Sequence, residues 1–205
     1  NSLFVSALTA IFGVLISYAC ALINVRTNLS KKVTKSIDIF SMVTNTVPGM
    51  VLGLAYLMIF NDSDLKGTFA IIIICNIIHL FTTPYLMAKN ALSKLNPTFE
   101  ITGELMGDTW IKTIIRVIIP NSISTIIEMF AYYFINSMVT ISAVIFLVSA
   151  RTSILTSKIQ ELQHFEDYNQ IFILSIIILL TNIIVKISSE IAYKKKSIRQ
   201  GDIIL

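Results

Sequence analysis

The stretch IFILSIIILLTNIIV, residues 171–185, decides the fold class, because as a helix it would be apolar on every face. A second stretch of the same kind, FAIIIICNIIHLF, occupies residues 69–81. A helix that is apolar all round lies in lipid or at the centre of a large protein. The chain has 205 residues, 55% of them hydrophobic and 14% charged, and is too short to bury several such helices. We therefore expect an all-α, polytopic membrane protein.

Five stretches are long and apolar enough to span a bilayer, which takes about 20 residues. They are approximately residues 3–25, 37–60, 68–89, 117–147 and 170–192. The fourth is longer than a hydrocarbon core of about 30 Å requires. We expect it to tilt strongly, to break, or to continue outside the membrane. The two cysteines, Cys20 and Cys75, lie inside such stretches and indicate neither a disulfide nor a metal site.

The positive charges predict an orientation. With alternating spans, 13 of the 16 Lys and Arg residues fall on one side. The cytoplasmic side retains positive charge, so the C-terminus is predicted to be cytoplasmic and Asn1 to lie outside. The basic character of the chain is therefore a topology signal, and we expect no nucleic-acid partner. An external start that is not Met predicts at least one further span before Asn1.

One polar loop between the spans has the pattern of a short helix. It reads NPTFEITGELMGDTWIKTIIRVIIP, residues 96–120. Glu100, Glu104 and Asp108 recur at i, i+4 and i+8 and are predicted to share one helical face. Ile101, Leu105 and Trp110 offer apolar contacts on another face. Such a helix could lie on lipid, but three acids suit an anionic leaflet poorly, so we favour docking in a protein groove.

This loop resembles the EAA loop of type I binding-protein-dependent ABC importer permeases, in which Glu-Ala-Ala, a Gly and Ile-x-Leu-Pro follow at fixed spacing. Gly107 and Pro120 keep the family spacing of 13 residues. Glu100 lies one residue early, and residues 101–103 occupy the Glu-Ala-Ala places. The resemblance implies five spans and a cytoplasmic coupling helix at residues 97–109. The residues implied to couple to an ATPase are Glu100, Gly103, Glu104, Gly107 and Asp108.

Gly107 and Pro120 also suit such a loop physically, and the chain has no nucleotide-binding loop of its own. A Gly at position 107 would let another helix approach closely, and Pro120 would end the loop where the next span begins. The sequence lacks the Gly-x-x-x-x-Gly-Lys-[Ser/Thr] loop that holds nucleotide phosphates. The chain is therefore expected to be a transport subunit rather than an enzyme, with no cofactor or metal of its own. ATP and Mg²⁺ would be bound by a partner.

The resemblance also implies the surroundings of the chain. The partners would be a cytoplasmic ABC ATPase, a second permease subunit or fused half, an extracytoplasmic substrate-binding protein and membrane lipid. The location would be the inner or plasma membrane of a bacterium. The chain could be a trimmed polypeptide or the second half of a fused double permease.

Two further stretches resemble this superfamily, in the branch that moves iron(III), thiamine or 2-aminoethylphosphonate. They are NTVPGMVLGLAYLMIFN, residues 45–61, and INSMVTISAVIFLVSA, residues 135–150. Pro48 would kink its span and expose carbonyl groups, while Gly49 and Gly53 form a small-x-x-x-small pair for close packing. Packing alone is the alternative role for these residues. The residues assigned to a translocation path are Pro48, Glu128, Asn136, Ser137, Thr140 and Ser142.

The substrate expected from the wording of these two stretches is a phosphonate such as 2-aminoethylphosphonate, with iron(III), thiamine or polyamine as alternatives. An ATP-independent secondary transporter or channel is the alternative of another class. It would use Glu128 and His79 for proton coupling, since ionisable groups within a membrane mark functional sites. For His79 a packing role is the favoured interpretation. A membrane-embedded enzyme is disfavoured because no metalloprotease or hydrolase motif occurs.

Overall fold

The computed structural model describes residues 1–27 and 29–201, with side chains described as far as Lys195. The described chain folds into a bundle of helices joined mostly by short loops. These helices are α1 Ser2–Arg26, α2 Lys31–Val43, α3 Gly49–Ile59, α4 Phe69–His79, α5 Thr82–Lys94, α6 Thr98–Leu105, α7 Trp110–Thr113, the π-helical turn η1 Ile114–Ile118, α8 Ile119–Val139, α9 Leu155–His164 and α10 Tyr168–Gly201.

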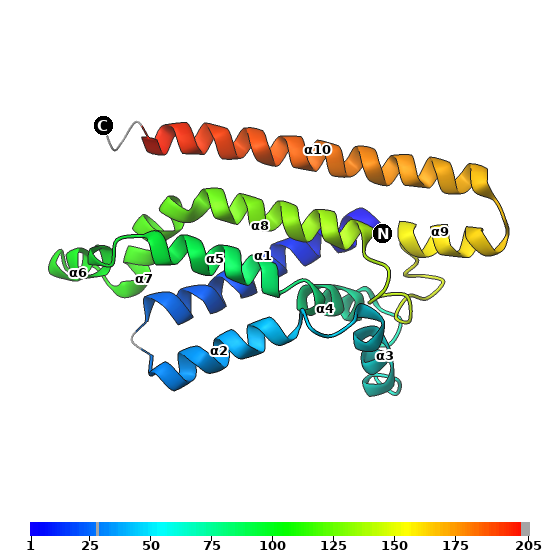
Figure 1. The fold of residues 1–205 in the computed structure, drawn as a ribbon, viewed down its shortest axis with the longest axis horizontal. Coiled ribbons are helices and arrows are strands. Elements are labelled where there is room, and N and C mark those ends of the chain that lie inside the picture. The colour runs from blue at the N-terminus through cyan, green and yellow to red at the C-terminus, as the bar shows by residue number, and fades with distance from the viewer. Residues whose placement is uncertain (28, 202–205) are drawn as a thin grey trace.

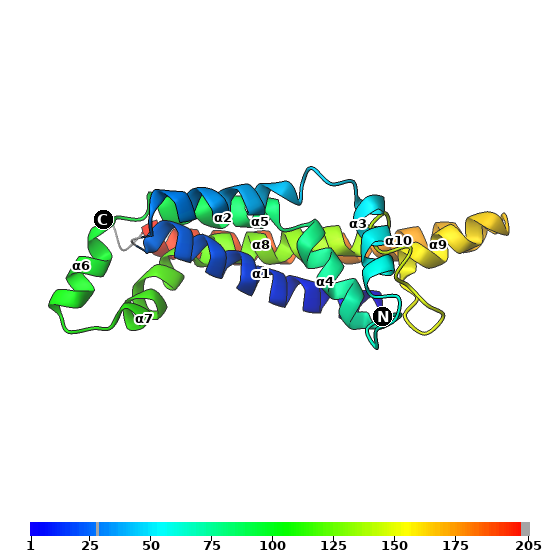
Figure 2. The ribbon, with the colours of Figure 1, turned by 90° about the horizontal axis from the view of Figure 1, so that it is seen from below.

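Helix α1 packs against α4, α5 and α8 with one face, while side chains of its other face, such as Phe4 and Leu15, are more than half exposed. Helices α2, α5, α8 and α10 run roughly along the same long axis (Figure 1). The view in Figure 2 shows α6 and α7 projecting from one end, whereas α3, α9 and Asn1 lie toward the other. Since α10 runs back from α9, its C-terminal turns lie at the α6 end. The two ends of the bundle therefore carry the two groups of loops that the orientation prediction separates.

Four of the five predicted spans form as expected in outline. Three are helical stretches long and apolar enough to cross a membrane: Ser2–Arg26, Trp110–Val139, which joins α7, η1 and α8, and Tyr168–Lys195. A further span is divided into α4 and α5, which are bent by 54° at a short break. Pro84 lies in the first turn of α5 and cannot donate a hydrogen bond back to Leu80, which favours a bend or break at this place. Length and composition thus support a multi-pass membrane protein.

The predicted span at residues 37–60 does not form a continuous helix. It is divided into α2, which already begins at Lys31, and the 11-residue apolar helix α3. Pro48 favours this division, because it has no N–H to continue the helical bonding and disfavours a helical backbone at the preceding residue, Val47. The Pro48 backbone itself is extended, at φ −57° and ψ 136°, immediately before α3. At about 1.5 Å per residue, α3 alone is too short to cross a hydrocarbon core. Pro48 therefore starts a new helix where the sequence predicted a kink.

The predicted span at residues 117–147 breaks, which is one of the three outcomes expected from its length. Helix α8 ends at Val139, and Thr140 has an extended backbone at φ −71° and ψ 122°. The chain then continues without regular helix until Leu155. Ala143, Val144 and Leu147 from this segment are buried against α4.

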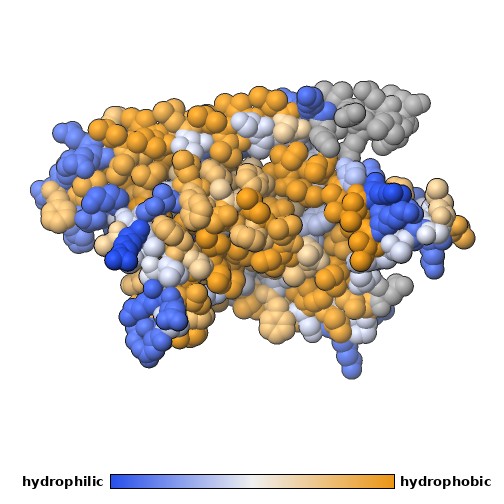
Figure 3. All heavy atoms as spheres, turned by 180° about the vertical axis from the view of Figure 1, so that it is seen from behind, coloured by the Kyte–Doolittle hydropathy of each residue, from blue (hydrophilic) through white to orange (hydrophobic). Residues whose placement is uncertain are grey.

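Hydrophobic side chains cover the middle of the molecule, and hydrophilic ones gather toward both ends (Figure 3). Helix α10 contributes strongly to this apolar surface, with Phe172, Ile184 and Ile191 each more than half exposed. Soluble proteins rarely expose apolar surface on this scale. Lipid is the surrounding that such a surface fits.

Candidate functional site

Helix α6, at one end of the bundle, is a short exposed helix with defined ends. At its start, the Asn96 side-chain oxygen accepts hydrogen bonds from the Thr98 backbone N–H at 2.9 Å and the Thr98 hydroxyl at 2.8 Å. At its end, Gly107 N–H donates to Glu104 O and Asp108 N–H to Gly103 O, each at 2.9 Å. These two bonds form a Schellman cap around Gly107, whose φ is +79°. The helix lies within the predicted residues 97–109.

Asp108 does not share a helical face with Glu100 and Glu104, so that prediction was wrong. The helix ends at Leu105, and the left-handed backbone of Gly107 turns the chain away before Asp108. The Asp108 carboxylate instead pairs with Lys112 and lies 3.8 Å from the guanidinium of Arg116. Asp108 thus connects the loop to the following helices α7 and η1.

The two loop glycines have different structural roles within this chain. A Cβ added at Gly107 would meet no atom of the described chain within 4 Å, so within this chain Gly107 is needed for its positive φ. A close approach of a partner's helix to Gly107 stays a prediction. A Cβ at Gly103 would clash with the Thr113 hydroxyl and lie 3.2 Å from Thr113 Cγ2. Within the described chain, close approach occurs at Gly103, where α6 packs against α7.

The outer face of α6 is apolar and unpartnered within the described chain. Ile101, Leu105 and Met106 are 58%, 83% and 78% exposed, and we call these three residues the α6 surface. Glu104 is also exposed, whereas Glu100 turns inward to Arg26. Beside α6 is a cavity of about 620 Å³ lined by residues that include Pro97, Glu100 and Trp110. The α6 surface and the Glu104 carboxylate thus lie next to this cavity.

The residues assigned to a translocation path fall into separate groups. Glu128 and Asn136 both lie on α8, along a cavity of about 890 Å³ between α8 and α10. Asn182, Lys186 and Glu190 line the facing side from α10. The sequence prediction missed these three, although a polar residue inside an apolar span is the signal that could have found Asn182. This cavity brings two predicted residues together.

Pro48, Thr140 and Ser142 lie elsewhere, around the start of α3 and the break after α8. A Cβ built at Gly49 would lie 2.5 Å from Ser142 Oγ and 3.1 Å from His79 Cε1. The Gly49–Gly53 pair thus packs closely as predicted, although against an irregular segment rather than a helix. The His79 ring therefore lies at this junction. Whether His79 serves packing alone or also proton coupling stays a prediction.

Ser137 is buried between α8 and α4, and its hydroxyl accepts a hydrogen bond from Asn76 Nδ2 at 3.0 Å. Asn76 is itself fully buried and was missed by the sequence prediction. A polar pair of this kind joins two helices in a surrounding without water. Ser137 thus occupies a helix contact, and the cavity between α8 and α10 is lined by other residues.

We expect Ser137→Ala to destabilise the protein modestly, because the Asn76 amide then loses its partner. Hydrogen bonds between membrane helices contribute about 0.6–2 kcal/mol, so the expected loss is of that order. The free energy of unfolding in detergent would measure it. Ser175→Ala, on the largely exposed helix α10, is the control. Unchanged stability in Ser137→Ala would contradict the role of this pair.

Residues 13–197 match the family described as binding-protein-dependent transport system inner membrane component. The chain belongs to this family. It is therefore a permease of the ABC importer class, and the resemblance inferred from Gly107 and Pro120 is confirmed.

Two curated relatives are similar in sequence. The putative ferric transport system permease protein FbpB 1 of Haemophilus influenzae is 33% identical over 150 residues, which is 72% of this chain and 23% of the relative. The ferric transport system permease protein FbpB of Actinobacillus pleuropneumoniae is 32% identical over 154 residues, covering 74% of this chain and 22% of the relative. The matched part of the permease thus spans less than a quarter of these relatives.

Two solved structures share the fold. A bacterial ABC transporter involved in the import of the acidic polysaccharide alginate has a TM-score of 0.77 at 15% identity, covering 95% of this chain and 77% of its own. An inward-facing MetNI methionine ABC transporter has a TM-score of 0.77 at 12% identity, covering 95% and 92%. At these identities the likeness shows the fold of the permease and nothing of its substrate.

Proposed function

We propose that this permease forms the membrane pathway, or half of it, of a ferric iron importer driven by a separate ATPase. The proposed substrate rests on the similarity to two ferric transport permeases, each over more than 70% of the chain. It supports the iron(III) alternative over the phosphonate that the sequence motifs favoured.

The proposed docking site for the ATPase is the α6 surface with Glu104 and the neighbouring hollow. The apolar side chains of Ile101, Leu105 and Met106 are too exposed to serve the fold. A groove on a partner that buries them would gain about 25 cal/mol per Å² of apolar area. The left-handed backbone of Gly107 ends α6 next to this surface. On the side facing the bundle, Asp108 pairs with Lys112 and Gly103 packs against Thr113. The α6 end of the bundle would then be cytoplasmic, as the distribution of Lys and Arg predicts.

We place Glu128 and Asn136 on the proposed translocation path, because they face a large cavity on a spanning helix. An ionisable residue at such a position is costly unless it faces water or a partner. Pro48, Thr140 and Ser142 would act near the outer end, where α3 and the break after α8 meet. A second permease core, as another subunit or a fused half, would complete the pathway, and an external binding protein would deliver iron(III).

Transport in the native membrane tests this proposal. We expect the permease to co-purify with an ATPase, and uptake of radioactive iron(III) to require ATP and the binding protein. Retention of 2-aminoethylphosphonate by that binding protein, without iron(III), would overturn the substrate. Uptake without ATP, and without an ATPase partner, would instead favour a secondary transporter. A variant of the ATPase that cannot hydrolyse ATP is the control for energy dependence.

A further inference from the structure

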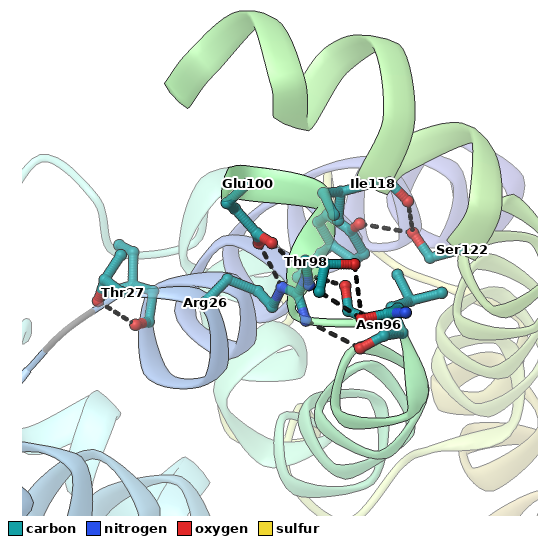
Figure 4. Close-up of polar contacts among 10 residues, drawn as sticks. Arg26, Thr27, Asn96, Thr98, Glu100, Ile118 and Ser122 are labelled. Carbon is teal, nitrogen blue, oxygen red and sulfur yellow. Dashed lines mark hydrogen bonds and ion pairs between the residues drawn. The ribbon is translucent and has the colours of Figure 1, made fainter. Parts of the chain in front are cut away.

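Arg26, the last residue of α1, is bound tightly to the segment that leads into α6 (Figure 4). Its Nε and Nη2 atoms donate to the two carboxylate oxygens of Glu100 at 2.5 and 2.6 Å. Its Nη1 and Nη2 atoms donate to the carbonyl oxygens of Leu95 and Asn96, each at 3.1 Å. One side chain therefore contacts both the linker after α5 and the first turn of α6.

This contact differs from an ordinary surface ion pair. Only 5% of the Arg26 side chain and 22% of the Glu100 side chain are exposed, so water screens the two charges little. The forked geometry uses the planar guanidinium, which a lysine ammonium cannot reproduce. Removing either partner would leave the other charge buried and unpaired. The pair is therefore a rigid connection between two helix ends.

Helix α6 has few other attachments to the bundle. None of its residues is buried. Its C-terminal part contacts α7 through Gly103 and Thr113. Its N-terminal part is held by Arg26, while Asn96 fixes the turn between α5 and α6 through Thr98. A displacement of α6 would therefore reach α1 through Arg26.

Helix α1 can pass such a displacement to the centre of the bundle. It packs along α5 and α8 over much of its length. Two turns before Arg26, the Tyr18 hydroxyl forms a buried hydrogen bond of 2.6 Å with Ser122 on α8. Asn24, on the same helix, donates to Asp38 of α2 and to Tyr85 of α5 at 2.9 and 2.5 Å. The end of α1 next to Arg26 is thus bonded to three other helices.

We propose that Arg26 is a positioning residue that fastens α6 to α1, so that α1 moves together with α6 during transport. This role rests on the proposed docking of an ATPase at the α6 surface. Without the pair, the α6 surface stays exposed and still binds the ATPase, but its displacement no longer reaches α1. ATP hydrolysis then continues while less solute is moved for each ATP.

The test compares solute transported per ATP in the native complex. We expect Arg26→Gln to keep the amount of co-purified ATPase and to lower this ratio about tenfold, within the roughly 5–150-fold range of coupling between sites. Glu100→Gln, which keeps the side-chain shape, is expected to lower the ratio similarly. It replaces Arg26→Gln in the test if that variant does not accumulate in the membrane. Glu100→Arg should lose more, and adding Arg26→Glu to it should recover part of the loss. Lys35→Gln, which removes an exposed charge from α2, is the control.

Each outcome has a definite meaning. A ratio equal to that of the unmodified protein in Arg26→Gln or Glu100→Gln overturns the role of the pair and leaves the proposed function intact. Loss of the ATPase from the Arg26→Gln complex also overturns it, because Arg26 would then serve docking. If the unmodified permease captures no ATPase, the proposed function fails and the role of Arg26 fails with it.

Discussion

Gly107→Glu is expected to lower ATP-dependent uptake about tenfold or more, while the permease still accumulates in the membrane. Gly107 holds φ at +79°, where a residue with a Cβ is strained by about 1–2 kcal/mol. The space around a Cβ at this position is open, so the fold tolerates the substitution. The added carboxylate would instead project beside the α6 surface and obstruct a partner. Uptake of radioactive iron(III) and the amount of co-purified ATPase measure the effect.

Gly107→Asn is the matched control, because asparagine adopts a left-handed backbone more readily than other residues with a side chain. It should retain more uptake than Gly107→Glu and should preserve the end of α6. Undiminished uptake in Gly107→Glu would contradict a docking role for this end of the loop.

Gly53→Val is expected to have the largest effect on stability. A Cβ at Gly53 would collide with the carbonyl oxygen of Ala143 and lie 3.0 Å from its carbonyl carbon. These are backbone atoms, so no side chain can rotate away, and α3 must separate from the segment after α8. Overpacking of this kind costs about 1–3 kcal/mol or more. The thermal unfolding temperature in detergent and the amount of protein in the membrane measure the loss.

Ala55→Val, two positions along the same helix, is the control for this substitution. Ala55 is exposed, so the same valine there meets no buried backbone and should leave the unfolding temperature nearly unchanged. An equal response of the two variants would show that the contact between α3 and Ala143 contributes little.

Apolar composition was sufficient to predict the membrane class and most spans, because lipid requires long apolar helices with all backbone bonds satisfied internally. It did not predict the division of residues 37–60. Pro48 was recognised as a disturbance, but whether a proline kinks a helix or starts a new one depends on packing. Here Gly49 and Gly53 fit closely against Ser142 and Ala143, and this contact fixes α3 as a separate element.

The α6 loop was located correctly from the spacing of Gly107 and Pro120, but its internal geometry was predicted less well. Periodicity placed Asp108 on the face of Glu100, since spacing alone cannot show that a helix ends after two turns. Arg26 and Glu100 lie 74 residues apart, and no local pattern connects them. Their pairing follows from the way α1 and α5 end side by side.

The way α6 is held has a thermodynamic consequence. A helix of eight residues is unstable on its own in water, where roughly 12–15 residues are needed even for favourable sequences. In this protein part of the ordering entropy of α6 is already lost on folding, through the packing of Gly103 against Thr113 and through the Gly107 cap. Because the loop is already ordered, less conformational entropy is lost when a partner binds it. A free peptide of residues 97–109 contains the Gly107 cap but lacks the packing of Gly103 against Thr113, and should compete for the same partner only at much higher concentration.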